Sequence, residues 1–594
     1  MKKRRLRRFL WLMLGAVALS VLAWLMSVRP YIGYVPVRSD AWQWMAFHVH
    51  STMSDGHGTP EEIARAARVS GIGMVILADH GRPNPAAAAF RETFDGVTII
   101  GGSEANLPEG HLIGFGMTAV PPYWLPPWPP DALSDLTEWG GAGAVAYPED
   151  AVFRWQYWEP GFRPAMLEVL NPSTVFRRLG GWEKTRLVAA FGLSEYAFLD
   201  FLAPPVAELA RWDQLLADGP VFALFGLNAH GGVHLGGGLR LPVPSYAALF
   251  NLWAVGLTES EADPEEALRR GEYFCCLRGA AEPARLCFDA VHGKRVYPVG
   301  NWTVPAEASL RLDVAVDGYT PRLVLRRDGR QIREIVDREL VVDRPTPGVY
   351  RAEIYLTDHP LLAPDVPWIL TNPLRVTPGS AGESPPAPVR TPSAGAGESD
   401  HPKSRPKQTA QASPPTDGPV ESTGPTNPPA DLDGTLFPNG ISPDLRLVDP
   451  SVFHIEKDAE TTATYAAVSG VWTLDYHLAE HQTGGDNRWV ALADRSRRDL
   501  SEYSGFHIRA WSDTQRRYYV EIRSGDRWYY ASFKCYPGRE TVCHVPFSRF
   551  YRVLNGRQPI PLADIDSWFI TQSNYTGPAG FSARLKLLEI GFYR

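Results

Sequence analysis

Histidines and acidic residues follow several short apolar runs in the first half of this sequence. Imidazole and carboxylate groups, with no cysteine among them, suit a borderline or hard divalent ion such as Mn, Zn or Fe. The residues concerned are His48 and His50 after residues 43–47, Asp79 and His80 after 74–78, Glu104 after 97–100, and Asn228 and His230 after 221–225.

The His48-Val49-His50 segment ends the first apolar run. Two histidines at positions i and i+2 of a strand point to the same side, so both imidazoles can reach one metal ion. Such a pair is more often just two strand residues. The recurrence of histidines and acids after several runs is what favours a metal site.

The apolar runs alternate with helical segments between about residues 43 and 290, which is typical of a βα-repeating domain. Thr59, Pro60 and Glu62 predict a helix start, with Thr59 as N-cap and Glu62 closing a capping box. In a barrel-like α/β domain the carboxyl ends of the strands meet on one face, where the chemistry sits. We therefore expect the polar residues to converge there.

The ordered motifs in this region resemble those of the polymerase and histidinol phosphatase (PHP) family of metal-dependent phosphoesterases. The resemblance covers roughly residues 43–290. The matching motifs are His48-Val49-His50-Ser51, Ser54-Asp55-Gly56, Ala78-Asp79-His80, Gly102-Ser103-Glu104, His111-Leu112-Ile113-Gly114 and Asn228-Ala229-His230.

The resemblance implies a distorted βα barrel that binds two or three divalent ions. Carried over by position, one metal site would use His48, His50, Glu104 and Asn228, a second Asp55, His80 and His230, and a third Glu104 and His111. Asp79 and His111 are the candidate catalytic residues. Tyr147 stands where the family has a histidine before proline, and Asn228 where it has an aspartate. We therefore expect two firmly held ions and a third that is weak or absent.

The implied reaction is hydrolysis of a phosphate mono- or diester by a metal-activated hydroxide. An amide or lactone hydrolase would use similar ligands, and a glycan-processing hydrolase of another bond is a further alternative. So is a degenerate metal-binding and glycan-binding surface protein without activity, in which Tyr147 and Asn228 mark a lost site.

Three further segments follow. Residues 295–377 alternate like strands, with Asp328-Gly329 as a hairpin turn, and predict a small β-sandwich. Residues 378–436 are rich in Pro, Ser, Thr and Gly, which predicts a disordered linker. Residues 440–594 resemble jelly-roll carbohydrate-binding modules, which implies a cell-surface glycan as partner. Trp528, Tyr529 and Tyr530 could stack on sugar rings, although core packing is the default for any one of them.

The N-terminus predicts a membrane anchor. Six positive charges in residues 1–8 precede residues 9–26, an uncharged run of 18 residues. That length can span a bilayer as a helix, and the basic end then stays in the cytoplasm. We expect a single-pass cell-membrane protein with most of the chain outside the cytoplasm. A cleaved signal peptide is the alternative.

The bulk properties set the remaining limits. With 594 residues the chain is too long for one core, and about three or four globular units are expected. A net charge of −7 gives no sign of a nucleic-acid-binding surface. Five cysteines cannot form a disulfide framework here. Cys535 could pair with Cys543, and Cys287 with Cys275 or Cys276, but free thiols are the simpler expectation.

Overall fold

The computed structural model describes residues 11, 13–15, 29–236, 239–241, 243–258, 263–378, 444–480, 488–552, 558–573 and 580–594. One compact unit comprises Met1–Pro378 and Thr435–Arg594. The other, Gly379–Gly434, lies outside the described residues, and so does the linker predicted for residues 378–436 apart from Pro378.

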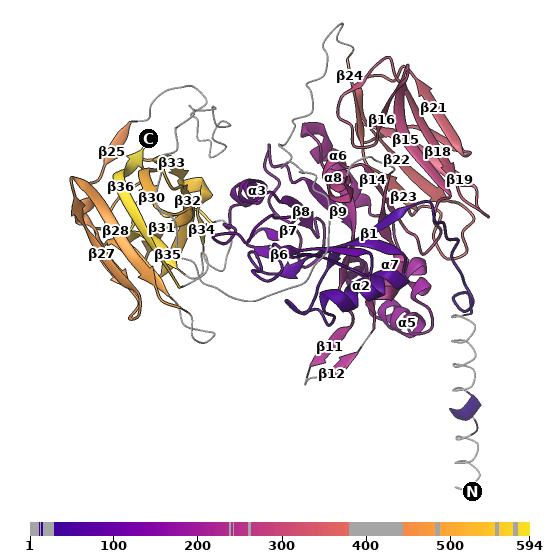
Figure 1. Ribbon diagram of the computed structural model, residues 1–594, viewed down its shortest axis with the longest axis horizontal. Coiled ribbons are helices and arrows are strands. Elements are labelled where there is room, and N and C mark those ends of the chain that lie inside the picture. Colours follow the sequence, from indigo (N-terminus) through magenta and orange to yellow (C-terminus); the bar gives the residue numbers. More distant parts are fainter. Residues whose placement is uncertain are drawn as a thin grey trace, which may run out of the picture. The chain divides into compact units, whose positions relative to one another are not determined.

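The segments that carry the candidate ligands form one sheet region with mainly parallel neighbours (Figure 1). Strand β1 (Gln43–Val49) pairs in parallel with β2 (Ile72–Leu77) and with β10 (Phe222–Ala229). The parallel pairings continue from β10 to β9 (Met166–Leu170) and from β9 to β8 (Ala142–Ala146). Successive strand ends therefore lie at one edge, as the sequence predicts; the barrel itself stays a prediction.

Shorter strands complete this region. Strand β3 pairs in parallel with β6, whereas β7 pairs antiparallel with both β6 and β8. Their bounds, with those of the neighbouring strands, are β3 (Asp79–His80), β4 (Arg91–Phe94), β5 (Val97–Ile100), β6 (Gly102–Leu107), β7 (Gly110–Phe115), β11 (Val233–Gly236), β12 (Leu239–Leu241), β13 (Ala254–Leu257) and β14 (Tyr273–Cys276).

Helix α2 (Pro60–Val69) connects β1 to β2 and starts as the sequence predicts. The Thr59 side chain accepts a hydrogen bond from the Glu62 N–H, and the Glu62 carboxylate accepts one from the Thr59 N–H. Ile63 and Ala67 are its fully buried stripe. The other helices of this region are α3 (Pro129–Glu138), α4 (Pro172–Arg178), α5 (Gly181–Phe191), η1 (Glu195–Phe201), α6 (Val206–Asp218), α7 (Tyr246–Leu252) and α8 (Pro264–Arg270).

One further sheet and an extension of the first follow this region. A four-stranded antiparallel sheet has the order β16-β15-β18-β21, whereas β19, β20, β22, β23 and β24 continue the sheet that contains β1, through the antiparallel pairing of β14 with β23. Asp328 and Gly329 join β19 to β20 with φ values of 50° and 75°, as a two-residue hairpin turn requires. Their bounds are β15 (Arg285–His292), β16 (Arg295–Pro298), β17 (Val304–Pro305), β18 (Ser309–Ala315), β19 (Pro321–Arg327), β20 (Arg330–Val336), β21 (Glu339–Asp343), β22 (Gly348–Leu356), β23 (Ile369–Thr371) and β24 (Leu374–Thr377).

The C-terminal residues form two six-stranded antiparallel sheets around their own apolar core. Strand β36 is central in one sheet, between β28 and β30, and β35 lies between β29 and β31 in the other. The bounds are β25 (Leu445–Leu447), η2 (Pro450–Val452), β26 (His454–Lys457), β27 (Thr462–Val468), β28 (Val471–Leu478), β29 (Trp489–Asp494), β30 (Gly505–Ser512), β31 (Arg516–Ser524), β32 (Arg527–Cys535), β33 (Thr541–Pro546), η3 (Phe547–Arg549), β34 (Tyr551–Arg552), β35 (Ser567–Ser573) and β36 (Phe581–Tyr593).

The predicted membrane anchor needs correction. Most of residues 9–26 lies outside the described residues; in that segment only Trp11 and residues 13–15 are described, as helical. Across the described part of the chain, no helix combines the length and the apolar character needed to cross a bilayer. The prediction of a single-pass membrane protein, which rested on the apolarity of that one run, is corrected accordingly: no helix among the described residues supports it. None of the five cysteines, all of which are described, forms a disulfide bond.

Candidate metal centre

One candidate cluster gathers around the buried carboxylate of Glu104. Its Oε2 lies 3.3 Å from Nε2 of His48 and 3.4 Å from Nε2 of His50. All three residues are at most 1% exposed. They come from β1, the residue after it, and β6, so the parallel sheet brings together groups that are more than fifty positions apart in the sequence.

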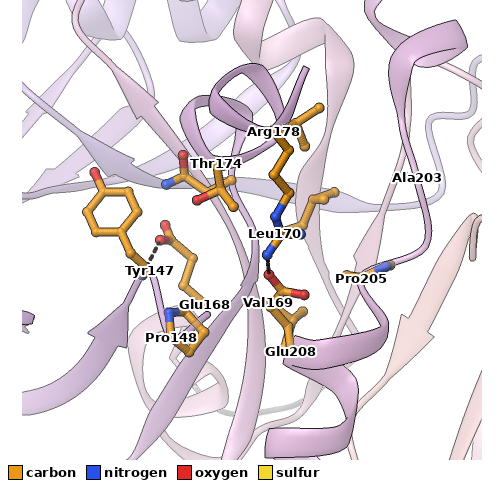
Figure 2. Close-up of a pocket in the computed structure, with 12 residues that line it drawn as sticks. Tyr147, Pro148, Glu168, Val169, Leu170, Thr174, Arg178, Ala203, Pro205 and Glu208 are labelled. Carbon is orange, nitrogen blue, oxygen red and sulfur yellow. Dashed lines mark hydrogen bonds and ion pairs between the residues drawn. The ribbon is translucent and has the colours of Figure 1, made fainter. Parts of the chain in front are cut away.

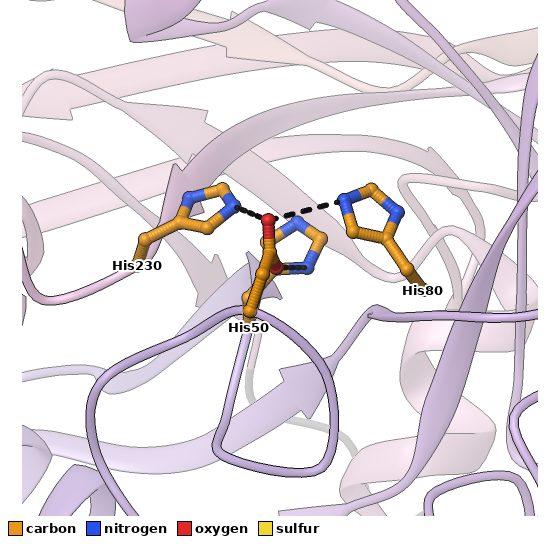
Figure 3. Close-up of side chains that lie close together, drawn as sticks. His50, His80 and His230 are labelled. Atoms are coloured by element: carbon orange, nitrogen blue, oxygen red, sulfur yellow. Dashed lines mark ion pairs between the residues drawn. The ribbon is translucent and has the colours of Figure 1, made fainter. Parts of the chain in front are cut away.

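A second cluster gathers around the carboxylate of Asp55, in the loop that leads to α2. Its oxygens lie 3.3 Å from Nε2 of His230, 3.6 Å from Nε2 of His80 and 3.6 Å from Nδ1 of His50. His80 and His230 face one oxygen of this carboxylate, Oδ2, and His50 faces the other, Oδ1 (Figure 3). This cluster is open to solvent, because the Asp55 side chain is 51% exposed and that of His80 42%.

The donor set fits divalent ions. Ligand atoms bound tetrahedrally at about 2.0–2.1 Å from a zinc ion lie about 3.4 Å from one another, close to the separations in both clusters. Nδ1 of His50 is buried and has no hydrogen-bond partner among the described residues, although a buried polar atom normally has one. His50 belongs to both clusters, with Nε2 toward Glu104 and Nδ1 toward Asp55. The arrangement can therefore hold two neighbouring ions.

A local backbone distortion aims the first ligand. His48 has a φ of 66°, and the register of β1 shifts between Phe47 and Val49 against both neighbouring strands. His48 is therefore a bulge residue. The sequence analysis had assumed a regular strand alternation for it instead. A positive φ is costly for a residue other than glycine, and such strain is typical of functional sites.

Glu168 is a functional residue that the sequence analysis missed. It lies in the middle of β9 and is 1% exposed, and its Oε1 is 2.7 Å from Nδ1 of His48. A carboxylate that accepts a hydrogen bond from the second nitrogen of a metal-binding histidine fixes the orientation of that imidazole. A charged residue inside the apolar run 166–170 was the signal that could have identified it.

The charges of the first cluster are strongly coupled. Burial lowers the pKa of His48, but the carboxylates of Glu168 and Glu104 outweigh it and raise this pKa to about 10. Burial lowers the pKa of His50 to about 3, with His230 and His48 adding to the effect. Without a metal ion, the positive charge of protonated His48 thus offsets the negative charge of the Glu104 and Glu168 carboxylates. The pKa of Glu104 stays well below its usual range, because its histidine neighbours outweigh the burial that would raise it.

In the open cluster, too, histidine neighbours shift the pKa of the carboxylate. Burial alone would raise the pKa of Asp55, but the hydrogen bond and the charge of His230, with the charges of His50 and His80, bring it below its usual value. The carboxylate is therefore ionised and ready to bind a cation at neutral pH.

Residues of the predicted third site lie beside Glu104. Nδ1 of His111 is 2.7 Å from Oε1 of Glu104. The Tyr147 ring contacts both His111 and His48, with centroids 5.4 Å and 5.6 Å away. Burial and the charge of Glu104 raise the pKa of the Tyr147 phenol well above its usual value. The side chain is therefore a neutral phenol where a third ligand was expected.

Asn228 faces the buried cluster, as predicted by position. Its Oδ1 lies 3.1 Å from Nε2 of His50, and its Nδ2 donates a hydrogen bond to the Ser173 hydroxyl at 2.7 Å. That donation fixes the amide with its oxygen toward the cluster. Asn228, like His48 and Tyr147, has a positive φ, at 45°.

Asp79 is fully buried and belongs to neither cluster. Its carboxylate accepts hydrogen bonds from the Ser51 N–H and hydroxyl, both at 2.8 Å, and from the Ser54 hydroxyl at 2.6 Å. It holds the loop that carries Asp55. Its predicted catalytic role, and that of His111, stay predictions.

Tyr246 of α7 secures the same loop and was also missed. Its hydroxyl donates to the His50 carbonyl oxygen at 2.8 Å and accepts from the Gly58 N–H at 3.0 Å. No sequence pattern links a helix residue nearly two hundred positions away to this loop.

A cavity of about 20 Å³ lies behind Tyr147 and Glu168 (Figure 2). Its lining includes Asn171 Nδ2 and Glu208 Oε2, which are buried and have no hydrogen-bond partner among the described residues. The volume suits about one water molecule. It is too small to hold an organic ligand.

The aromatic residues Trp528, Tyr529 and Tyr530 of the C-terminal sandwich differ in their exposure to solvent. Tyr529 is 1% exposed and belongs to the core. Trp528 is 37% exposed and lies beside Phe569, with ring centroids 5.3 Å apart. Tyr530 is intermediate in exposure, so Trp528 is the most exposed ring of this run.

Comparison with known proteins identifies no family. No family model matches the chain, and no curated protein matches it in sequence. Among solved structures, a two-domain protein from Bacteroides vulgatus containing a predicted PHP-like metal-dependent phosphoesterase is 14% identical, with a TM-score of 0.26; the match covers 58% of this chain and 99% of that one. A family 11 carbohydrate-binding module from Clostridium thermocellum is also 14% identical, with a TM-score of 0.21, covering 26% and 96%. Similarity at this level establishes neither a family nor an activity.

Proposed function

We propose that this protein is a metal-dependent phosphoesterase that hydrolyses a phosphate mono- or diester. The observation that carries the proposal is the pair of adjoining ligand clusters that share His50. Two imidazoles and a carboxylate make up the buried cluster, and Asp55 with three imidazoles the open one. The proposal includes the distorted βα barrel predicted for residues 43–290.

Divalent ions held there would supply a water of lowered pKa and positive charge against the phosphoryl oxygens. The chain's own residues set the geometry. Glu104 and Asp55 lie on either side of His50 and keep the two clusters adjacent. Glu168 fixes the His48 imidazole. The exposed side of Asp55 and His80 leaves room for the substrate and for departure of the alcohol.

Metal content and hydrolysis test the proposal together. The purified full chain should bind about two divalent ions, and with added manganese it should release phosphate from an aryl phosphate or cleave an aryl phosphodiester. A variant with His48→Ala and His50→Ala should lose both properties. A matched variant with His292→Ala and His477→Ala, two exposed histidines, should keep them. Equal rates in the two variants would refute the proposal.

A degenerate metal-binding protein is the second candidate, favoured by Tyr147 and Asn228 at positions where the PHP resemblance predicts a histidine and an aspartate. It predicts bound metal without hydrolysis. A hydrolase of another bond predicts release of sugar, or cleavage of an amide or lactone, in place of phosphate release. The same metal-loaded chain tested on these substrates separates the three.

We further propose that the C-terminal sandwich binds a cell-surface glycan and holds the phosphoesterase near it, which raises the effective substrate concentration. The half-exposed Trp528 ring supports this, since aromatic faces stack on sugars. Retention of the chain on insoluble glycans should fall for Trp528→Ala. The core substitution Tyr529→Phe, which keeps the packing ring, should leave it unchanged.

A further inference from the structure

Tyr147 is buried beside the buried cluster. Its ring contacts the imidazoles of His48 and His111 and also Phe153, whose centroid is 5.7 Å away. The residue is only 4% exposed. Rings held by three aromatic neighbours have little rotational freedom, so the position of the hydroxyl is fixed.

The backbone of Tyr147 is fixed as well. Its φ of 52° lies in the left-handed region, which a tyrosine enters only when its surroundings hold it there. The Tyr147 N–H points to Oε2 of Glu168 at 3.3 Å, the carboxylate that orients His48 (Figure 2). The Tyr147 carbonyl accepts hydrogen bonds from the N–H groups of Asp150 and Trp155, both at 3.3 Å.

The guanidinium of Arg177, from α4, lies over the rings of Tyr147 and Phe153. Its guanidinium carbon lies 5.4 Å from the Tyr147 centroid and 4.8 Å from that of Phe153. Asp150 holds the guanidinium, with Nε at 3.1 Å and 2.9 Å from its two carboxylate oxygens. Asp150 is itself fixed by the N–H groups of Val152 and Phe153. The stacked arginine therefore sets the plane of the tyrosine ring.

No hydrogen bond joins the Tyr147 hydroxyl to another described residue, although the ring contacts the imidazoles of His48 and His111. This unused donor adjoins the buried cluster, which shares His50 with the open cluster where the proposed function leaves room for a phosphate ester. We propose that Tyr147 is a further catalytic residue, whose hydroxyl donates a hydrogen bond to a phosphoryl oxygen of the substrate, and that Arg177 is its positioning residue. The inference rests on the proposed phosphoesterase function.

The physical reason lies in the charge of the reacting group. Negative charge on the phosphoryl oxygens must be stabilised during transfer, and a preorganised donor in a dry site does so without reorganising. A fixed O–H beside His111 can supply part of that stabilisation where the resemblance would place a third ion. The chain then needs only the two ions that its clusters can hold.

The test compares the full-length, manganese-loaded protein with Tyr147→Phe, using an aryl phosphate ester as the probe. Phenylalanine keeps the ring and its packing but removes the donor. We expect kcat to fall about 100-fold with little change in KM, the loss typical of one oxyanion donor. The number of bound ions per chain and the melting temperature should stay unchanged. Tyr297→Phe, a buried tyrosine of β16, should behave as the original protein.

Arg177→Gln and the double variant with Tyr147→Phe test the positioning role. Arg177→Gln should also lower kcat, because the ring loses its stacked partner. If the arginine acts only through the tyrosine, the double variant should be no slower than Tyr147→Phe alone. A purely structural role would instead show as a lower melting temperature with additive losses in rate.

Three results would overturn the inference, each in its own way. Wild-type kcat in Tyr147→Phe would show that the hydroxyl does not act. Loss of one bound ion in that variant would show that Tyr147 is a metal ligand. Complete inactivity of the unsubstituted, metal-loaded chain on phosphate esters would defeat the proposed function itself, and this inference with it.

Discussion

Oε1 of Glu168 lies 2.7 Å from Nδ1 of His48, at a site where both side chains are closed off from solvent. The contact turns Nε2 of the same imidazole toward Glu104. Gly226 on the adjacent strand makes room for it, since a Cβ at that position would lie 1.6 Å from Oε1 of Glu168. The Glu168 carboxylate, the His48 imidazole and the absent side chain of Gly226, on three different strands, thus depend on one another.

Replacing Glu168 should weaken metal binding without removing a ligand. In Glu168→Gln the amide oxygen can still accept from His48, but the negative charge that favours a bound cation is lost. We expect divalent-ion affinity to fall about 10–100-fold, the usual cost of losing such a partner. Calorimetric titration with manganese measures this. Glu92→Gln, on the exposed strand β4, is the control; equal affinities in both variants would show that Glu168 does not support the cluster.

Gly226→Ala should disrupt the same contact sterically. The new methyl group would overlap the Glu168 carboxylate, which must leave His48 or force β9 and β10 apart. We expect a loss of about 1–3 kcal/mol in the free energy of unfolding, typical of an overpacked core, and weaker metal binding. Gly181→Ala is the matched control: a Cβ there meets nothing within 4 Å, and alanine favours the helix α5. A neutral effect of Gly226→Ala would show that the carboxylate can be accommodated elsewhere.

The features of this site that the sequence predicts depend on nearby residues or on strand direction. Residue types after successive apolar runs identified His50, His80, Glu104 and His230 as a group, because parallel strands place their ends along one edge, whereas Asp55 followed only from the resemblance of its motif. The cap of α2 follows from three residues, Thr59, Pro60 and Glu62, and the structure confirms it. In both cases the controlling interactions lie within a few positions of one another or follow from strand direction alone.

The remaining features depend on contacts between distant segments. Strand alternation predicts the side of the sheet for His48, but the bulge that gives it a φ of 66° arises from pairing with two neighbours at once. The role of Glu168 depends on the pairing of its strand, β9, with β10, which carries Gly226. Tyr246 holds its loop from a helix that sequence spacing does not relate to it. Asp79, by contrast, sits in a recognisable motif, yet only the structure shows that its oxygens face Ser51 and Ser54.

The stability of the metal-free chain should depend on pH in opposite senses through two histidines. The pKa of His48 is about 10 in the folded chain against 6.5 when unfolded, so its contribution is complete below pH 6.5 and is lost as pH rises toward 10. The pKa of His50 is about 3 against 6.5, so its contribution is present above pH 6.5 and is lost as pH falls toward 3. Together they predict greatest stability near pH 6.5.

Denaturant unfolding of chelator-treated protein from about pH 4 to about pH 9 measures this curve. His48→Gln should flatten the alkaline side, and His50→Gln the acidic side. If the alkaline slope persisted in His48→Gln, the proton would not reside on this imidazole, and the balance between His48 and the two carboxylates would have to be revised.

Replacing Asp79 tests whether its carboxylate has a structural or a catalytic role. In Asp79→Ala the Ser51 and Ser54 groups lose a shared acceptor at a fully buried position, and the loop that presents Asp55 loses its anchor. We expect the open cluster to lose its ion while the buried one keeps its own. The free energy of unfolding should fall by about 1–3 kcal/mol, the cost of buried donors left without partners. Counting bound ions per chain by elemental analysis measures the first effect, and denaturant unfolding the second.

Asp55→Asn provides the comparison, since it weakens the same cluster directly and leaves the loop anchored. Both variants should therefore bind one ion fewer, but only Asp79→Ala should lose stability. The opposite pattern is equally informative: if Asp79→Ala kept both ions and its full unfolding free energy yet hydrolysed no phosphate ester, the carboxylate would act in the chemistry itself. Asp79 would then have the catalytic role that its motif suggests, and its contacts with the serines would serve to hold it ready for that role.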